Sequence, residues 1–366
     1  MAATNARQSS NNKKRVSKQQ REARKKRKVV IFGLEIVLLV VMLIVLWGVL
    51  KGTEVKKITV NDEELEQNMN ETVLENETLK GYRNVALFGV DSTTGKLDRG
   101  TRSDTIIIAS INQDTGEVKL VSLYRDTFLN QGNDKYGKCN AAYAKGGPEQ
   151  AMMMLNTNMD LNITDFVTVG FQGLADTIDA LGGVYIDVDS EEIKHINNYQ
   201  MCIAENLKCS YTEVKETGYQ LLNGLQATAY CRIRYTKGDD FMRAQRQREV
   251  IKAIADQAKK ANVSSLTKIA NDVLPEVYTS LELEEIVSLL MDISKYNIVD
   301  EGGFPEESMR ATGTIGGDGS CVIPISLKSN VVWLHEFLFG EEGYTPSKEV
   351  ENCSQNVYDR TNEYLK

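Results

Sequence analysis

Histidine is almost absent from this sequence, which holds two histidines among 366 residues. His195 and His335 stand in unremarkable contexts, so the sequence argues against a histidine-dependent catalytic triad and against a histidine-rich zinc site. Three common signatures are also missing, since the chain contains no GxGxxG, no P-loop and no GxSxG motif. Any site in this chain must therefore rely on other side chains.

Long apolar runs are equally scarce, and the exception is VVIFGLEIVLLVVMLIVLWGVL, from Val29 to Leu50. Its 22 residues carry one charge, Glu35, and are long enough to cross a bilayer as a helix. Residues 1–28 carry eleven basic side chains and one acidic side chain. This basic excess predicts a cytoplasmic N-terminus. No small-residue cleavage pattern follows the run, so we expect an uncleaved anchor and not a signal peptide.

These features predict a single-pass protein of the cell membrane. We expect residues 1–28 to be a disordered, basic cytoplasmic arm, residues 29–50 to be a transmembrane helix, and the chain from about residue 51 onward to be extracellular. A basic arm can also indicate nucleic acid. The adjoining apolar run instead favours the lipid bilayer as a partner and argues against nucleic acid.

The six cysteines suit the oxidising environment outside a cell. Spacing alone does not choose among the possible pairings. We hypothesise the disulfides Cys202–Cys209, Cys321–Cys353 and Cys139–Cys231. The alternative is six free, buried thiols, because cysteine is also a common core residue.

The rest of the chain reads as a stalk, a folded domain and a tail. Residues 51–80 are acidic and polar and are expected to form an extracellular stalk, followed by a catalytic domain at 81–345 and a C-terminal tail at 346–366. Within the domain, short apolar runs predict strands and 3.6-residue periodicity predicts helices. Strands are expected at 83–90, 105–111, 118–124, 165–170 and 184–188, and helices at 147–159, 171–183, 221–232, 243–260, 283–296 and, last, 331–339. The predicted fold class is α/β, with a mixed central β-sheet flanked by helices in α/β/α layers.

Two carboxylates and an arginine are expected at one edge of this sheet. If the first three strands are antiparallel, with a hairpin turn at 112–117, then Asp91, Asp104 and Arg125 lie at the same edge, beside Arg102 of the intervening loop. Two carboxylates suit Mg²⁺, which keeps several waters and binds phosphate oxygens. Guanidinium groups match phosphate bidentately. The alternative is that these aspartates only end strands and form surface salt bridges.

A second cluster lies in CRIRYTKGDDFMRAQRQRE, residues 231–249. An extended segment would send Arg232 and Arg234 to one side, and a helix would place Arg243 and Arg246 on one face. Arg243 also lies near a helix N-terminus, which favours an anion. The alternative is a solvated basic face paired with Asp239 and Asp240.

Seven motifs occur in one order and, with the basic arm and the single span, resemble the LytR–CpsA–Psr family of bacterial envelope proteins. They are GVDS (89–92), RSDT (102–105), SLYRDT (122–127), KCNAAYAKGG (138–147), GG (182–183), LNGLQATAYCRIR (222–234) and GDDFMRAQRQ (238–247). Tyr124 stands where the family usually has proline. Cys139 and Cys231 stand where it usually has an aliphatic residue.

The resemblance implies a phosphotransferase that moves a secondary wall glycopolymer, such as teichoic acid or capsule, from a polyprenyl-diphosphate carrier to peptidoglycan. It implies that Asp91 and Asp104 hold Mg²⁺, that Arg125 is the residue most involved in catalysis, and that Asp240 orients an arginine. The implied diphosphate ligands are Arg102, Arg125, Arg232, Arg234, Arg243, Arg246 and Gln247. The lipid tail would lie in an apolar tunnel, for which 151–159 and 171–181 are the candidate walls.

Three points stay open at the level of the sequence. The general base is either Asp126 or a metal-bridging carboxylate. The first alternative function is a non-catalytic envelope module that binds lipid-linked intermediates or regulates. The second is a diphosphatase that uses the same site with water as the acceptor.

Overall fold

The computed structural model describes residues 56–57, 65, 69–92, 96–234, 238–262, 265, 269 and 273–365. The predicted arm at 1–28 and the predicted transmembrane helix at 29–50 lie outside these residues. Within the part that is described, no helix has both the length and the apolar character needed to span a bilayer.

A seven-stranded mixed sheet forms the centre of the fold, with the strand order β1-β10-β7-β2-β3-β4-β11. Strand β3 pairs antiparallel with both β2 and β4, whereas β7 pairs parallel with β2 and β11 pairs parallel with β4. The bounds are Lys56–Lys57 (β1), Tyr82–Val90 (β2), Ser103–Asn112 (β3), Glu117–Leu123 (β4), Asp165–Val169 (β7), Val277–Thr279 (β10) and Asn297–Phe304 (β11). The predicted central strands and the 112–117 hairpin are therefore confirmed.

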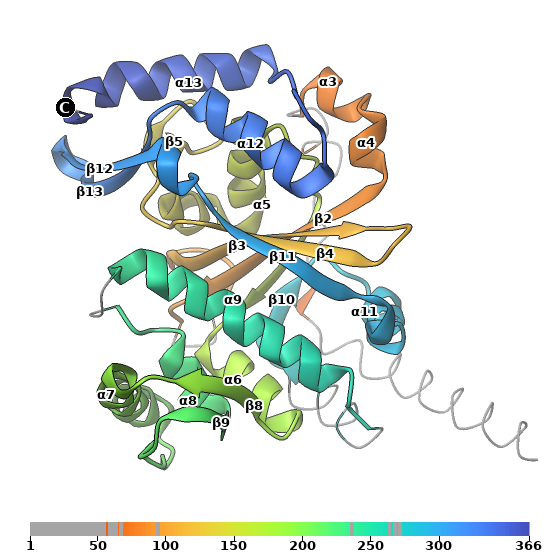
Figure 1. The fold of residues 1–366 in the computed structure, drawn as a ribbon, viewed down its shortest axis with the longest axis vertical. Helices are drawn as coiled ribbons and strands as arrows, with labels where there is room; N and C mark the ends of the chain where they lie inside the picture. Colours follow the sequence, from red (N-terminus) through yellow and green to blue (C-terminus); the bar gives the residue numbers. More distant parts are fainter. Residues whose placement is uncertain are drawn as a thin grey trace, which may run out of the picture. The chain divides into compact units, whose positions relative to one another are not determined.

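Helices cover both faces of the sheet, because the central strands are apolar on both sides. In β3, Ile106 and Ile108 pack with one helical layer, while Ile107 between them packs with the other. The first layer holds α5, α12 and α13, and α9 crosses the opposite face (Figure 1). Their bounds are Asn140–Met159 (α5), Asp239–Ala258 (α9), Leu327–Phe339 (α12) and Lys348–Thr361 (α13). The predicted α/β/α layers are confirmed.

Helix α5 contains the predicted helix at 147–159, but it already begins at Asn140. The break between the two parts is Gly147, whose φ of 70° is left-handed. A Cβ there would lie 2.7 Å from the carbonyl oxygen of Asp98, so only glycine fits this close approach.

A smaller cluster packs beyond α9 and closes one side of the site. It consists of α6 (Phe171–Ala180), β8 (Val184–Val188), α7 (Ser190–Leu207), β9 (Gly218–Leu222) and α8 (Gly224–Tyr230). Side chains such as Ile178, Ile186, Ile196 and Tyr230 form its core, which also takes in Val250 of α9. A capping box at Asn223 begins α8 and so sets where Arg232 and Arg234 leave that helix.

Both ends of the described chain belong to the domain, contrary to the predicted stalk and tail. In the 51–80 segment, β1 joins the sheet, and Leu65, Met69, Val73 and Leu79 are buried in the main core. That segment also forms α3 (Glu71–Leu74) and α4 (Glu77–Lys80). In the 346–366 segment, α13 buries Val350, Cys353 and Val357. These segments were misjudged because a polar composition hid a few widely spaced apolar residues.

Two hairpins and one further α-helix complete the regular elements of the described residues, beside short 3-10 helices. They are the hairpins β5 (Phe128–Asn130) with β6 (Tyr136–Lys138) and β12 (Arg310–Ile315) with β13 (Gly319–Pro324), and helix α11 (Leu283–Met291).

The three hypothesised disulfides are wrong in this structure, where all six cysteines are free. Cys139, Cys231, Cys321 and Cys353 are buried. Cys231 packs in the smaller cluster, whereas the others pack in the main core. The alternative of buried thiols therefore holds for four cysteines, while Cys202 and Cys209 are exposed.

Candidate active site

Asp91, Asp104 and Arg125 meet at one edge of the main sheet, as predicted. The end of β2 lies opposite the start of β3, and β4 returns antiparallel beside β3, so Arg125 leaves the sheet at the same edge. Arg125 donates from Nη1 to Oδ1 of Asp104 at 2.6 Å. The register of three antiparallel strands is what brings these charges together.

A second set of charges reaches the same space from α8 and α9. Arg234 binds Asp240 with two contacts, Nε to Oδ1 and Nη2 to Oδ2, each at 3.0 Å. Arg243 reaches Oδ1 of Asp240 from Nη2, also at 3.0 Å. Asp240 thus contacts two guanidinium groups at once, and its orienting role stays a prediction.

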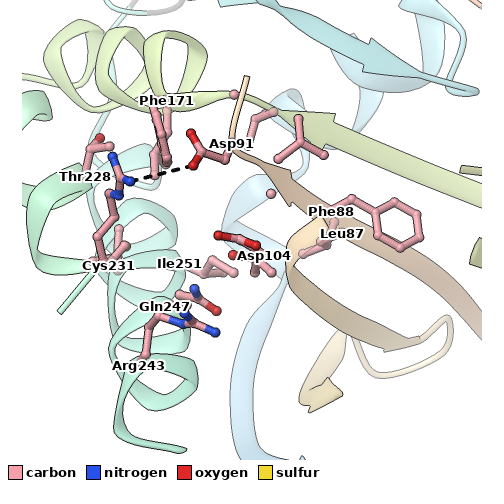
Figure 2. A pocket seen from close by; sticks show the side chains of 18 of the residues that line it. Leu87, Phe88, Asp91, Asp104, Phe171, Thr228, Cys231, Arg243, Gln247 and Ile251 are labelled. Atoms are coloured by element: carbon pink, nitrogen blue, oxygen red, sulfur yellow. Dashed lines mark ion pairs between the residues drawn. The ribbon is translucent and has the colours of Figure 1, made fainter. Parts of the chain in front are cut away.

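Both sets open into one cavity of about 510 Å³. In Figure 2, Arg243 and Gln247 reach from the helical side of this cavity toward Asp104, and Asp91 lies on the strand side. The charged and amide groups that line it are Asp91, Asp104, Arg125, Arg232, Arg234, Arg243 and Gln247. Both predicted clusters therefore contribute to a single site.

The rest of the cavity is apolar and extends away from the charged end. Helix α9 shows this gradient, because Arg243 and Gln247 are followed along the same cavity wall by Val250, Ile251 and Ile254. At a rise of about 1.5 Å per residue, Ile254 lies roughly 16 Å along the helix axis from Arg243. The opposite walls are formed by Leu87, Phe88, Val167, Val169, Phe171 and Leu174.

Helix α6 forms one wall of the apolar part, but the other proposed tunnel wall does not reach it. Phe171, Leu174 and Thr177 line the cavity. In the 151–159 segment, Met152 and Met154 are instead fully buried in the main core. Helices α5 and α6 lie on opposite faces of the sheet (Figure 1). Both have apolar faces, so their sequences do not tell which of them faces the cavity.

Burial and neighbouring charges shift the pKa values of the arginines at the charged end of the cavity. Burial lowers the pKa of Arg243, and the charges of Arg125 and Arg234 lower it further, whereas Asp240 raises it. At Arg234 burial also acts to lower the pKa, but the contacts with Asp240 outweigh it and the net shift is upward. An anion entering this space would relieve the repulsion.

The guanidinium of Arg232 makes cation–π contacts with two aromatic rings at the cavity wall. Its Cζ atom lies 4.2 Å from the ring centroid of Phe171 and 5.5 Å from that of Tyr199, and its Nη2 lies 3.8 Å from Oδ2 of Asp91. Cation–π contacts hold a guanidinium flat while leaving its edge free to bind an anion. Phe171 opens the predicted 171–181 wall, but its contact with Arg232 was not predicted, and Tyr199 was not predicted at all because it belongs to no charged motif.

Arg246 and Arg102 are not at the cavity, contrary to the prediction. Arg246 is 4% exposed and pairs through Nε with Oε1 of Glu192 at 2.7 Å. Arg102 is exposed and does not line the cavity. The wall of α9 repeats at i, i+4, i+7 and i+11 from Arg243, so Gln247 and not Arg246 shares its face.

Asp126 lies beside the site but outside the lining of the large cavity. Its Oδ1 is 3.1 Å from Nζ of Lys138, and its Oδ2 is 3.5 Å from Nε of Arg125. It lines a much smaller adjoining cavity together with Arg125, Asp240 and Arg243. This position suits the orientation of Arg125 better than contact with an incoming hydroxyl group.

The two cavity carboxylates have the chemistry of a magnesium site that is completed by its substrate. Mg²⁺ is typically bound through one or two carboxylates, with waters and substrate phosphates as the remaining ligands. Asp91 and Asp104 fit that set. No cluster of three or more histidine, cysteine or acidic side chains that could hold a metal ion by itself occurs among the described residues.

Comparisons with known proteins agree with this architecture. The profile described as the LytR_cpsA_psr family matches residues 45–317. A curated relative, the polyisoprenyl-teichoic acid–peptidoglycan teichoic acid transferase TagV of Bacillus subtilis, is 30% identical over 230 residues, which cover 60% of this chain and 56% of TagV. The chain spans between half and two thirds of the length of the first curated relatives that it matches.

Two solved structures share the fold. The crystal structure of B. subtilis TagV gives a TM-score of 0.56 at 25% identity and covers 73% of this chain and 99% of that one. The protein YwtF (TagT), also of B. subtilis, with bound octaprenyl pyrophosphate lipid gives a TM-score of 0.52 at 22% identity over 73% of this chain and 94% of that one. The latter likeness concerns the fold alone.

Fold and site together define an α/β/α protein with an arginine- and aspartate-lined pocket at a sheet edge, continuous with an apolar cavity. The sequence match assigns it further: the chain belongs to the LytR–CpsA–Psr family.

Proposed function

We propose that this protein is a phosphotransferase that attaches a secondary cell-wall glycopolymer, such as teichoic acid or capsule, from a polyprenyl-diphosphate carrier to peptidoglycan. The observation that carries the proposal is one cavity with arginines and aspartates at one end and apolar side chains along the rest. A prenyl diphosphate likewise has an anionic end, which matches the arginines, and a long apolar chain, which matches the rest of the cavity. The transferase name of TagV and the pyrophosphate lipid bound to TagT support this choice.

Binding divides between the two parts of the cavity. Arg125, Arg232, Arg234 and Arg243 bind the diphosphate oxygens, and Gln247 donates beside them. Arg125 and Arg232 are paired with Asp104 and Asp91, so they exchange part of those contacts for the substrate. The prenyl chain buries its surface against α6, α9 and β7, which supplies binding energy remote from the reacting atoms.

The reaction transfers one phosphorus between two oxygens. A sugar hydroxyl of peptidoglycan attacks the phosphorus that bears the glycopolymer, the phosphoanhydride bond breaks, and polyprenyl monophosphate leaves. Negative charge grows on the bridging and equatorial oxygens, where Arg125 and Arg243 stabilise it. The hydroxyl proton passes to a carboxylate on the cavity wall, Asp91 or Asp104, because Asp126 lies outside the cavity lining and orients Arg125.

We propose Mg²⁺ as the cofactor, held by Asp91 and Asp104. When bound, it would supply positive charge that offsets the charge of the phosphate groups. Removal of divalent ions with a chelator should therefore lower transfer, and addition of Mg²⁺ should restore it.

We also propose that residues 29–50 anchor the protein in the cell membrane, with the N-terminus in the cytoplasm and the domain outside. The support is the apolar 22-residue run behind a strongly basic arm. An anchor in the bilayer would keep the domain close to a carrier lipid in the same membrane. Protease added to intact cells should remove the domain and leave residues 1–28 protected.

The decisive experiment incubates the full chain in vesicles with a labelled lipid-linked glycopolymer and peptidoglycan fragments. Replacing Arg125 with Gln should lower transfer by about 10²- to 10³-fold, the usual cost of losing one preorganised charge-stabilising donor. Arg360→Gln, on the exposed face of α13, is the control and should transfer normally.

The same assay separates the alternatives. Specific binding of the lipid without turnover, unaffected by Mg²⁺, would favour a binding or regulatory module. Release of free glycopolymer in the absence of any acceptor would favour a diphosphatase.

A further inference from the structure

Arg310, the first residue of β12, contacts residues at the end of β4 and in α9, two of the elements that carry charges of the site, although it does not line the large cavity. Its Cζ atom lies 3.9 Å from the ring centroid of Phe241 and 5.0 Å from that of Tyr124. Its Nη1 donates to the Tyr124 hydroxyl at 3.0 Å and to the Pro305 carbonyl at 3.3 Å. Tyr124 and Phe241 also meet edge to face, with 4.6 Å between centroids. We call Arg310, Tyr124 and Phe241 the Arg310 clamp.

Each aromatic member of the clamp is the chain neighbour of a charged site residue. Tyr124 precedes Arg125, and Phe241 follows Asp240. The backbone at Tyr124 is firmly held, because its N–H donates to the carbonyl of Phe304 at 3.1 Å and its carbonyl accepts from the N–H of Thr127 at 2.9 Å. Each ring is thus attached to the backbone next to a charged side chain, so the packing of the two rings helps to set where those charged side chains begin.

A small cavity places the clamp directly against the site. Tyr124 lines this cavity of about 20 Å³ together with Arg125, Asp240 and Arg243. Tyr124, the clamp residue at this cavity, thus lies directly beside Arg125 and Arg243, which approach the substrate from two sides in the proposed function.

The surrounding structure is shaped to accept a tyrosine at this position. Gly303 of β11 lies so close that a Cβ there would overlap the Tyr124 hydroxyl. Burial raises the pKa of the Tyr124 phenol, so the phenol is protonated at neutral pH and accepts the Arg310 hydrogen bond as a neutral group. Side-chain packing and hydrogen bonding both support the same ring position.

We propose that Arg310 is a positioning residue. The Arg310 clamp fixes the end of β4 against the first turn of α9 and so sets the separation between Arg125 and the Asp240–Arg243 pair. This inference rests on the proposed function, in which those groups bind one diphosphate from two sides. Small errors in such a separation weaken transition-state stabilisation more than ground-state binding.

The test uses the full chain with Arg310→Met, which keeps an unbranched apolar side chain but removes the charge, the plane and the donors. Tyr124→Phe removes only the acceptor hydroxyl. The control is Arg360→Met, because the Arg360 Cζ lies 4.7 Å from the Tyr136 ring and so makes a comparable contact away from the site.

Three quantities are measured: kcat for transfer, the affinity for octaprenyl diphosphate, and amide hydrogen exchange of peptides covering 122–128 and 239–245. Arg310→Met should lower kcat about tenfold, with less than about a twofold change in affinity. It should also speed exchange in both peptides. Arg360→Met should leave all three unchanged, whatever its effect on the melting temperature.

The outcomes separate this inference from the proposed function. Wild-type kcat and wild-type exchange in Arg310→Met would overturn the positioning role while the proposed function stands. An equal fall of kcat in Arg360→Met would also overturn it, as a general stability effect. If the wild-type protein neither binds octaprenyl diphosphate nor transfers, the proposed function fails. The positioning role then depends on hydrogen exchange alone, and faster exchange of both peptides in Arg310→Met supports it.

Discussion

Arg243 and Arg246 differ by three positions on α9, yet they lie in opposite environments. Arg243 faces the cavity and shares Asp240 with Arg234. Arg246 pairs with Glu192 of α7 in the interior. At the residue scale, the same side chain is therefore a proposed ligand for substrate in one place and a cross-link between helices in the other.

Replacing Arg246 with Gln should lower stability and leave lipid binding intact. The carboxylate of Glu192, which is 10% exposed, would lose its cationic partner, and breaking such a buried pair costs about 3–5 kcal/mol. Urea unfolding measures this loss. The double variant Arg246→Met with Glu192→Leu should recover most of it. Weaker binding of octaprenyl diphosphate with unchanged stability would instead make Arg246 a ligand.

The thiols offer a second test at this scale. Burial raises the pKa of Cys231 to about 12 and the pKa values of Cys321 and Cys353 to about 11. At pH 8 these groups are thiolate for at most about one molecule in a thousand. Iodoacetamide should therefore label only Cys202 and Cys209 in the native protein and all six cysteines in urea. Fewer than six labels in urea without reductant would restore the disulfide hypothesis.

At the scale of elements, α9 joins the two parts of the cavity. Its first turns supply Arg243 and Gln247, and its later turns supply Val250, Ile251 and Ile254. One rigid helix thus sets the distance from the charged end to the apolar end. A change late in α9 should alter the selection of chain length without touching the charges.

The variant Ile254→Trp should narrow the apolar end of the cavity. Affinity for octaprenyl diphosphate is expected to fall about tenfold or more, because the long chain loses buried contact area. Affinity for geranyl diphosphate, which is short, should change less than about twofold. Displacement of a fluorescent prenyl diphosphate measures both. Equal losses for the two ligands would place Ile254 outside the lipid path.

At the scale of the whole domain, His335 and Asp160 join segments that are distant in the chain. His335 donates from Nε2 to the carbonyl of Met159 at 3.0 Å, and its ring stacks on Tyr344. Asp160 accepts from Asn70, Tyr344 and Ser347. The two ends of the domain are thereby held against α5.

This arrangement predicts a loss of stability in mild acid. Burial lowers the pKa of His335 from its usual 6.5, although Asp160 and Glu341 act to raise it. Just below pH 6.5, His335 therefore binds a proton more readily in the unfolded chain than in the folded chain. The free energy of unfolding is therefore unaffected by the titration of His335 above about pH 6.5. Below that pH it falls by up to about 1.4 kcal/mol per pH unit. Urea unfolding between pH 7 and 5 measures the slope, which His335→Gln should reduce. An unchanged slope would contradict the assignment.

Much of the sheet could be predicted because its signals are local. The triple isoleucine of β3, the polar turn at 112–117 and the alternation in β4 each identify a strand or a turn from adjacent residues. Antiparallel order then places Asp91, Asp104 and Arg125 at one edge without further information. The polar ends of the domain were misassigned because apolar residues such as Leu79 and Val357 stand alone among polar neighbours. The residues that they pack against are far away in the sequence.

The sequence by itself determined the central strands, the seven motifs that indicate the family, and the residue types available for anion binding, because all of these depend on neighbours along the chain. Only the tertiary structure decided which side chains reach the cavity. Of the predicted ligands, Gln247 lines the cavity and Arg246 does not, and of the two predicted walls, only α6 lines it. Arg310 was not predicted and lies behind Arg125. Such choices depend on helix rotation and on which face of the sheet each helix covers, and contacts between residues far apart in the sequence set both.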